Sequence, residues 1–501
     1  MISISGLPID SAAKSVLLEK LNLANERLLN RDSLLWGKAA ENEVLNRLGW
    51  IDLPEKSTQL LPKFDAIAAL RRKNSIDRIV LCGMGGSSLA PEVIAASNLE
   101  SELPLIILDS TDPADLLPIL ESDLSRTLFI FASKSGSTVE TNSHRALFHA
   151  ELIKQKLEIR NHLLVITDPN SALEIWAKEH AVQVLNGFAD VGGRFSALSA
   201  FGLAPAAICG IDVSILLDEA HDIALELAKP SNPAVFLALA IYQNGATFIS
   251  LPDTPLSQWI EQLIAESTGK EGKGLLPVIE SKRSKNSDVI RIVFAPSSGE
   301  NQKNEVYLST SLGGQFIFWE WTTALLCYLI EVNPFDQPNV TLAKERANSV
   351  LADKQRSVMK IPDNQLPTLL KDFVLKTNPI GYLGILAFLP KSYDKQINEL
   401  TGELRDKFDF PITFGWGPRY LHSTGQFHKG GVPTGSFLIL THDVEEDLEI
   451  PGQSYTFAQL QKAQAMGDLA ALVESKLNVL YLTLTKDLTL NKINQSLREV
   501  F

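Results

Sequence analysis

Residues Arg78–Glu92 read RIVLCGMGGSSLAPE, and this stretch contains the turn that decides the fold. Its apolar run Ile79–Cys82 predicts a short strand, and the glycines that follow predict a tight loop. Leu89–Glu92 carries a proline in its first turn and predicts the start of a helix. Such a loop turns backbone N–H groups and a helix N-terminus toward one point, which suits a phosphate dianion. The stretch therefore predicts a strand–loop–helix unit, and this loop alone does not decide the ligand.

A second loop of this kind lies further along the chain. The apolar run Leu128–Phe131 is followed by Ser133–Thr141, which holds several hydroxyls, one glycine and Lys134. Two such loops in one sheet, the second rich in hydroxyls, make a sugar phosphate the expected ligand. The first loop lacks the third glycine of the dinucleotide fingerprint, and neither loop has a G-x-x-x-x-G-K-[ST] motif nearby. Dinucleotide and nucleoside triphosphate binding are therefore not predicted.

Apolar and helical segments alternate from Ile79 to about Gly187 and predict a parallel sheet with helices on both faces. Ligands bind such sheets at the carboxyl ends of the strands, where both loops lie. The loop Asp190–Ser196 follows the last strand, and its Arg194 offers a fork of donors beside two glycines. The predicted strands are Ile79–Cys82, Leu105–Leu108, Leu128–Phe131, Leu163–Ile166 and Val182–Leu185.

Helical periodicity over residues 10–50 predicts a helical arm, and Val213 to about Leu351 predicts a second α/β unit. In this unit Glu266 stands where a helix runs into a loop rich in glycine and lysine. Gln337 and Lys344, the latter on a following helix, could reach one cleft. The predicted strands are Ala246–Leu251, Val289–Phe294 and Glu305–Leu308, and Leu325–Ile330 continues a helix.

The chain changes character from about Lys360, and we expect a small third α/β unit. Its loop Trp416–Gly431 is dense in donors and includes His422 and His428. The predicted strands are Tyr382–Leu389, Phe437–Leu440 and Val479–Leu484, and the predicted helices are Tyr393–Phe408 and Phe457–Leu472.

The composition sets limits on compartment and partners. The 501 residues suffice for several domains, and the net charge of −13 argues against nucleic acid or an anionic membrane as the main partner. Three cysteines in apolar settings indicate free thiols rather than disulfides or a zinc site. Neither a signal peptide nor an apolar run long enough to span a bilayer is visible. We therefore expect a cytoplasmic protein with no metal and no cofactor.

Together these motifs resemble the glucose-6-phosphate isomerase family, which carries two sugar-isomerase (SIS) domains. The tail from Tyr420 through Gly452 resembles more specifically the isomerase half of bifunctional transaldolase/glucose-6-phosphate isomerases, without room for the transaldolase barrel. The motifs occur in family order over about residues 75–350; they are Gly83–Ser87, Ser133–Thr141, Gly192–Ser196, Glu266–Lys270 and Asn333–Gln337 with Lys344.

The resemblance implies two SIS-type doubly wound parallel-sheet domains followed by a small C-terminal α/β domain. We expect residues 1–210 to hold the helical arm and the first SIS domain, residues 211–358 the second, and residues 359–501 the third domain with its histidine loop. The resemblance also suggests a homodimer.

The resemblance further implies a role for each candidate residue. Glu266 would move the proton between C1 and C2, and Arg194 would steady the enediolate. Gln337 and Lys344 would contact the sugar and assist ring opening. Gly86 and Ser87 would line the sugar pocket, and the residues that would hold the phosphate are Ser133, Lys134, Ser135 and Thr138.

One feature departs from the family pattern. A ring-opening histidine usually lies between the glutamate and lysine motifs, but this sequence has no histidine between His221 and His422. The third-domain loop is then the expected source, with His428 favoured because Gly425-Gln426 precedes it as Gly-Gln precedes the usual histidine. His422 remains open, and a neighbouring subunit could also supply the group.

The resemblance implies a metal-free aldose–ketose isomerase that interconverts glucose 6-phosphate and fructose 6-phosphate through a cis-enediol(ate). Two alternatives remain. A phosphosugar-binding regulator would need the phosphate loop but not Glu266, Arg194 and Lys344 together. An isomerase with broader epimer tolerance would also accept mannose 6-phosphate.

Overall fold

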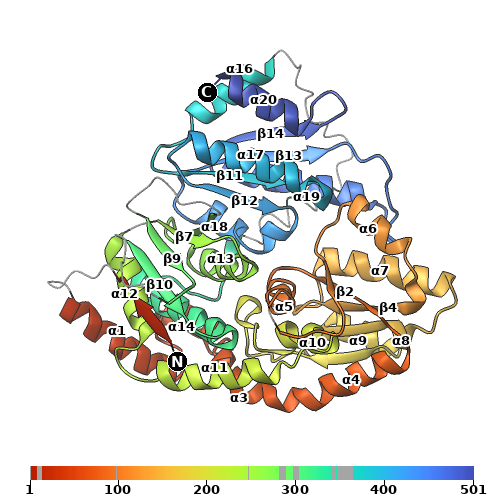
Figure 1. Cartoon of the computed structure of the whole chain (residues 1–501), viewed down its shortest axis with the longest axis horizontal. Helices are drawn as coiled ribbons and strands as arrows, with labels where there is room; N and C mark the ends of the chain where they lie inside the picture. The colour runs from red at the N-terminus through yellow and green to blue at the C-terminus, as the bar shows by residue number, and fades with distance from the viewer. Residues whose placement is uncertain are drawn as a thin grey trace.

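The structure is a computed structural model that describes residues 2–7, 14–97, 99–245, 247–280, 289–296, 304–339, 346, 351 and 365–500. In these ranges the chain forms three β-sheets with helices packed around them, and the sheets surround a common centre (Figure 1). The α/β fold class and the parallel sheets predicted from the sequence are confirmed. No helix in the described part of the chain is both long and apolar enough to cross a membrane.

The first sheet contains the five strands predicted from the apolar runs. They are wholly parallel and lie in the order β3-β2-β4-β5-β6, so that the direction of winding reverses between β2 and β4. Strands β4 and β5 are buried along their whole length, which explains their continuous apolar sequence. The bounds are β2 Arg78–Gly83, β3 Leu105–Leu108, β4 Thr127–Ala132, β5 Leu163–Thr167 and β6 Gln183–Asn186.

The second sheet repeats this winding in its parallel strands and adds an antiparallel edge. Its order is β1-β10-β9-β7-β8, and β1 pairs antiparallel with β10. Strands β7, β9 and β10 were predicted, but β1 and β8 were missed. Strand β8 carries Pro277, which an edge strand tolerates but which hid the strand in the sequence. The bounds are β1 Ser3–Ser5, β7 Phe248–Pro252, β8 Leu276–Glu280, β9 Ile290–Val293 and β10 Glu305–Ser309.

The third sheet is parallel throughout and has the order β12-β11-β13-β14. Its strands β11, β13 and β14 were predicted. Strand β12 was missed because its short sequence ITFGW contains a glycine and ends in the donor-rich loop. The bounds are β11 Tyr382–Ala387, β12 Ile412–Trp416, β13 Gly435–His442 and β14 Asn478–Leu484.

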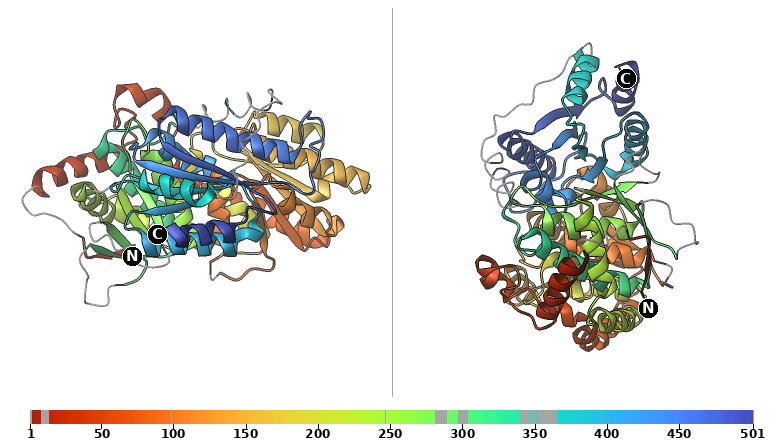
Figure 2. Two further views of the ribbon diagram at one scale, coloured as in Figure 1. Left: turned by 90° about the horizontal axis from the view of Figure 1, so that it is seen from above. Right: turned by 90° about the vertical axis from the view of Figure 1, so that its left-hand side faces the viewer.

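Helices cover the sheets and form the predicted N-terminal arm, which begins with α1 and lies away from the third sheet (Figure 2). The bounds are α1 Lys14–Leu29, α2 Glu41–Val44, α3 Leu53–Lys56, α4 Leu61–Lys73, α5 Leu89–Ala95, α6 Pro113–Leu120, α7 Val139–Lys154, α8 Ile159–His162, α9 Ala172–Glu179, α10 Ala200–Ile208, α11 Ser214–Leu227, α12 Pro233–Asn244, α13 Pro255–Thr268, α14 Leu312–Ile330, α16 Leu366–Leu375, α17 Asp394–Lys407, α18 Gly425–Gly430, α19 Phe457–Glu474 and α20 Leu490–Val500.

Packing between the units brings their loops together. One continuous core joins the arm to both N-terminal sheets, and the long apolar helix α14 lies within it. Helices α5 and α13 pack against each other between the sheets, and α18 of the third unit contacts α13. Because these contacts run throughout the molecule, the boundaries at residues 210 and 358 remain predictions.

Candidate active site

A cavity of about 340 Å³ opens where the three units meet. It lies beside the point where the winding of the first sheet reverses, between β2 and β4, which is where ligands bind in sheets of this kind. Its volume falls in the range of small-molecule sites. The lining residues are Glu43, Arg47, Met84, Gly85, Gly86, Ser87, Lys134, Ser135, Thr138, Asp168, Gly192, Gly193, Arg194, Phe195, Gln262, Glu266, Phe335, Gln337 and His422.

The hydroxyl loop after β4 forms one end of the cavity. Ser135 and Thr138 line it, whereas Ser133 is buried behind them and its Oγ lies 2.8 Å from Thr138 Oγ1. Thr138 precedes helix α7, so the backbone N–H groups of the first helical turn face the same region. This end of the cavity therefore offers hydroxyl and amide donors suited to an anion.

Lys134 is held by an acidic partner. Its Nζ donates to Asp168 and, at 3.1 Å, to the carbonyl oxygen of Phe188. Burial lowers the pKa of the Lys134 ammonium, and the Asp168 carboxylate opposes that effect. Lys134 thus lines the cavity as half of an ion pair rather than as a free cation.

The glycine loop after β2 presses directly against the Gly192–Ser196 loop. A Cβ atom on Gly86 would lie 2.1 Å from the carbonyl oxygen of Gly193 and 3.1 Å from the backbone nitrogen of Arg194. Only glycine fits there without moving the backbone that carries Arg194. Ser87 lines the cavity beside this contact.

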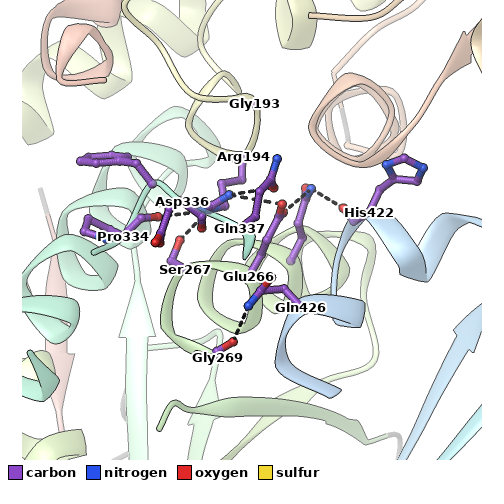
Figure 3. A network of polar contacts seen from close by, with 12 residues as sticks. Gly193, Arg194, Glu266, Ser267, Gly269, Pro334, Asp336, Gln337, His422 and Gln426 are labelled. Atoms are coloured by element: carbon purple, nitrogen blue, oxygen red, sulfur yellow. Dashed lines mark hydrogen bonds and ion pairs between the residues drawn. The ribbon is translucent and has the colours of Figure 1, made fainter. Parts of the chain in front are cut away.

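Glu266 lies in the last turn of α13 and is 5% exposed. Its Oε1 is 3.2 Å from Arg194 Nη1, and its Oε2 accepts from Gln262 Nε2 at 3.1 Å. Figure 3 shows Arg194, Glu266 and Gln337 converging from three different segments. Both carboxylate oxygens are thereby oriented, and the group still faces the cavity.

All three guanidinium nitrogens of Arg194 donate hydrogen bonds. Its Nε donates to Ser267 Oγ at 2.9 Å, its Nη1 to Gln337 Oε1 at 3.4 Å, and its Nη2 to the carbonyl oxygens of Pro334 and Asp336. The segment that carries these carbonyls is tied down in turn, because Lys270 Nζ donates to Asp336 Oδ1 at 2.6 Å. The guanidinium is therefore preorganised beside Glu266, which suits stabilisation of a negative charge that develops there.

His422 reaches the cavity from the third unit. It ends a short 3-10 helix at Arg419–His422, and its carbonyl oxygen accepts from Gln262 Nε2 at 2.7 Å. Its ring Nε2 lies 3.0 Å from Glu140 Oε1, and Gln464 Nε2 donates to the same oxygen at 2.7 Å. A buried carboxylate thus orients the imidazole, an arrangement typical of acid–base histidines.

His428 is not among the residues that line this cavity. It is 5% exposed in α18, and its Nδ1 is 2.8 Å from the hydroxyl of Tyr382. Burial lowers the pKa of the His428 imidazole well below its ordinary value. The structure thus brings His422, and not His428, to the cavity wall. Lys344 lies outside the described residues.

Several lining residues were given no role from the sequence. Glu43 and Arg47 come from the helical arm, Asp168 from the polar turn after β5, and Gln262 from the turn of α13 before Glu266. The spacing of Gln262 and Glu266 by one helical turn was a usable signal. The sequence contains no such signal for Glu43 and Arg47, because no nearby motif connects the arm with the loops that complete the cavity.

No group of three or more His, Cys, Asp or Glu residues in the described ranges is arranged to hold a metal ion.

Comparison with known proteins places this geometry in context. Residues 68–250 match the family model described as phosphoglucose isomerase. A glucose-6-phosphate isomerase of Thermus thermophilus is 34% identical over 280 residues, which cover 53% of this chain and 64% of that protein. A second from the same species is 35% identical and is covered over 58% of its length. The match therefore spans about three-fifths of these two curated relatives.

Other relatives match over longer ranges. The glucose-6-phosphate isomerase of Trichormus variabilis is 26% identical over 448 residues, which cover 72% of this chain and 84% of that protein. Among solved structures, a hypothetical protein of Thermus thermophilus is 27% identical with a TM-score of 0.61, covering 70% of this chain and all of that one. A glucose-6-phosphate isomerase of Chlamydia trachomatis, 18% identical with a TM-score of 0.57, shares the fold over 75% of this chain and 91% of its own.

Proposed function

Because residues 68–250 match the phosphoglucose isomerase family model, we propose that the chain interconverts glucose 6-phosphate and fructose 6-phosphate. The observation that carries this proposal is the position of Glu266, a buried carboxylate held between Arg194 and Gln262 at the wall of a cavity whose far end is rich in hydroxyls. A base, a cationic stabiliser and an anion-binding loop are the groups that this isomerisation needs.

The hydroxyl loop would anchor the substrate. Ser135, Thr138 and the first turn of α7 would donate to the phosphate, as expected for an anion at a helix N-terminus. The sugar carbons would then extend along the cavity toward Glu266. Anchoring one end of the sugar fixes the reacting carbons at the other end, so that proton transfer becomes an intramolecular step.

His422 would open the sugar ring. Opening a cyclic hexose requires a proton at the ring oxygen, and His422, a residue of the cavity wall, carries an imidazole that Glu140 holds in place. This role passes to His422 rather than to His428, because His428 is buried against Tyr382. Lys344, which the resemblance also assigns to ring opening, stays a prediction.

Glu266 would then carry out the isomerisation. Its carboxylate removes the proton from C2, and the electrons move to the carbonyl oxygen at C1 to form the cis-enediolate. A proton then moves from the C2 hydroxyl to the C1 oxygen, and the same carboxylate returns its proton to C1, which leaves the carbonyl at C2. Arg194 lies 3.2 Å from this carboxylate and would offset the negative charge of the intermediate. Gln337, which accepts from Arg194, would contact the sugar hydroxyls.

The test compares the wild-type protein with Glu266→Gln. Conversion of fructose 6-phosphate is followed by NMR, together with incorporation of solvent deuterium at C2. Loss of both conversion and incorporation in the variant, with binding of a phosphorylated hexitol retained, is the expected result. Glu158→Gln, an exposed carboxylate far from the cavity, serves as the matched control. Full turnover by the Glu266 variant would refute the assignment.

We propose a homodimer in the cytoplasm as the working form. Three free, buried thiols fit a reducing compartment. With a chain mass of 55.0 kDa, light scattering on the eluted protein distinguishes a dimer from a monomer directly.

A further inference from the structure

The basic groups around the cavity are not equivalent. Four basic side chains line it, and three of them face a carboxylate. Arg47 forms no ion pair within 4.0 Å in the described ranges, although its charge acts at longer range on the Asp168 carboxyl and lowers the pKa that burial raises. Among the described residues its guanidinium makes a single recorded hydrogen bond, from Nη1 to the carbonyl oxygen of Asn46 at 2.9 Å. The three paired groups are Lys134 with Asp168, Arg194 with Glu266, and His422 with Glu140.

The acidic residue one helical turn before Arg47 makes its recorded hydrogen bond to another residue. Glu43 lies one helical turn earlier and also lines the cavity, but its Oε2 accepts from Asn333 Nδ2 at 3.0 Å. No ion pair within 4.0 Å joins Glu43 to Arg47 in the described part of the chain. The guanidinium therefore keeps most of its donors available to a ligand.

Arg47 lines the same cavity as Lys134, Ser135 and Thr138. Its Cδ would be 3.8 Å from a Cβ on Gly192, which places the side chain against the Gly192–Ser196 loop. Burial lowers the pKa of the Lys134 ammonium, and the charge of Arg47 lowers it further, so the two cations are within electrostatic reach of each other. Arg47 and the phosphate loop thus share one region of the cavity.

A phosphate dianion at this end would otherwise meet little positive charge. Lys134 is neutralised by Asp168, and Ser135 and Thr138 offer only uncharged donors. The chain as a whole carries a net charge of −13, so attraction from the overall field is excluded as well. The balancing charge has to come from a residue at the site.

We propose that Arg47 is the cation that pairs with the substrate phosphate, which makes the N-terminal helical arm part of the binding site. This rests on the proposed function, since it assigns the phosphate of the same substrate. Guanidinium binds phosphate through two parallel N–H donors, so the pairing also fixes the orientation of the phosphate group. The arm would then discriminate phosphorylated from unphosphorylated sugars.

The test is a binding measurement that does not depend on turnover. Sorbitol 6-phosphate, its uncharged counterpart sorbitol and inorganic phosphate are titrated calorimetrically into the wild type, Arg47→Met and Arg47→Lys. Loss of a charge-assisted pair should weaken sorbitol 6-phosphate and phosphate by about 10- to 100-fold in Arg47→Met, with partial recovery in Arg47→Lys. Binding of sorbitol should change less than about threefold by the same reasoning.

Two further readouts separate this role from a structural one. In the isomerase assay Arg47→Met should raise KM with little change in kcat, because the phosphate contact is the same in ground state and transition state. Its melting temperature should match that of Arg160→Met, an exposed control on α8. A fall in melting temperature with equal weakening of sorbitol would indicate a structural role and overturn the proposal.

The failure of this proposal is distinguishable from failure of the proposed function. If the wild type binds sorbitol 6-phosphate through Arg47 but does not isomerise fructose 6-phosphate, the function is wrong and the Arg47 assignment stands. If the wild type isomerises and Arg47→Met binds sorbitol 6-phosphate as tightly, the assignment is wrong and the function stands. Absence of phosphate-dependent binding in the wild type would refute both.

Discussion

The imidazole Nε2 of His422 lies 3.0 Å from Oε1 of Glu140, although 282 positions separate the two residues in the chain. Glu140 belongs to the first turn of α7 in the first unit, and His422 belongs to the third. The pair is therefore formed only when the third sheet docks on the first. The third unit thus contributes a residue to the candidate active site.

Replacing His422 by Asn should impair ring opening selectively. The exchange between the α and β anomers of glucose 6-phosphate, measured by NMR, reports ring opening without proton transfer to C1. We expect that exchange to fall by about 10²- to 10⁴-fold, the usual contribution of a positioned acid–base group. Glu140→Gln, which loses the charge that orients the ring, should have a smaller effect.

The matched control for this prediction is His180→Asn, an exposed histidine at the end of α9. It should leave anomer exchange unchanged. Anomer exchange at the wild-type rate in the His422 variant would remove this residue from the mechanism.

Glu261 lies in helix α13 and should make the stability of the folded protein depend on pH. Burial raises the pKa of this carboxyl from 4.5 to about 8, and the Arg419 guanidinium only partly opposes the shift. Between these two values the unfolded chain is ionised at this position while the folded chain holds the proton. Folding therefore takes up a proton, and the stability of the wild type falls as pH rises through this window.

Glu261→Gln removes this dependence, so its melting temperature should exceed that of the wild type by a margin that grows from pH 5 to pH 8. The corresponding free-energy difference grows by ~1.4 kcal/mol per pH unit. Thermal unfolding of both proteins across this range is the measurement. A margin that shrinks with rising pH would mean that Glu261 is ionised in the folded protein.

Much of the fold could be predicted because many of its strands appear in the sequence as short apolar runs. All five strands of the first sheet were found in this way, most clearly β4 and β5, which are buried along their whole length, although β3 and β6 are only partly buried. The missed strands lack that signal. Strand β1 is only three residues long and is not fully buried, and β8 and β12 carry a proline and a glycine within their short sequences.

Some residues of the candidate site could be predicted from the sequence and others could not. Residues within compact motifs, such as Ser135, Glu266 and Arg194, all reached the cavity wall. The choice between His422 and His428 depended on which side of one short loop faces the cavity, and the sequence of that loop does not reveal it. Arg47 could not be found at all, because its position follows from packing of the arm against loops far away in the sequence.

Gly86→Ala should displace Arg194 indirectly, by moving the backbone that carries it. The new Cβ would overlap the carbonyl oxygen of Gly193, and both partners are backbone, so the loop must move. Because misplacement of a catalytic group by about 1 Å can cost on the order of 10²-fold in rate, we expect kcat to fall by about 10- to 100-fold. Gly402→Ala, where a Cβ meets open space in α17, is the control and should retain full activity. Equal activity in both variants would show that the loop adapts.

His428→Asn should affect stability far more than ring opening. The Tyr382 hydroxyl lies 2.8 Å from His428 Nδ1, and the two rings lie 5.7 Å apart in a stacked arrangement within the third unit. Burial holds the pKa of this imidazole well below its ordinary value, which favours a neutral ring hydrogen-bonded to the Tyr382 hydroxyl. Its replacement leaves the buried Tyr382 hydroxyl without its recorded partner, at a cost of about 1–3 kcal/mol.

Thermal unfolding and anomer exchange, measured on the same preparations, test this assignment. Tyr382→Phe removes the same hydrogen bond and leaves His428 in place, so it should lower the melting temperature by less than His428→Asn and keep anomer exchange near the wild-type rate. The opposite pattern, a His428 variant with wild-type stability and abolished anomer exchange, would return ring opening to His428. The third unit would then supply its histidine from α18, and that helix would have to reorient toward the cavity when substrate binds.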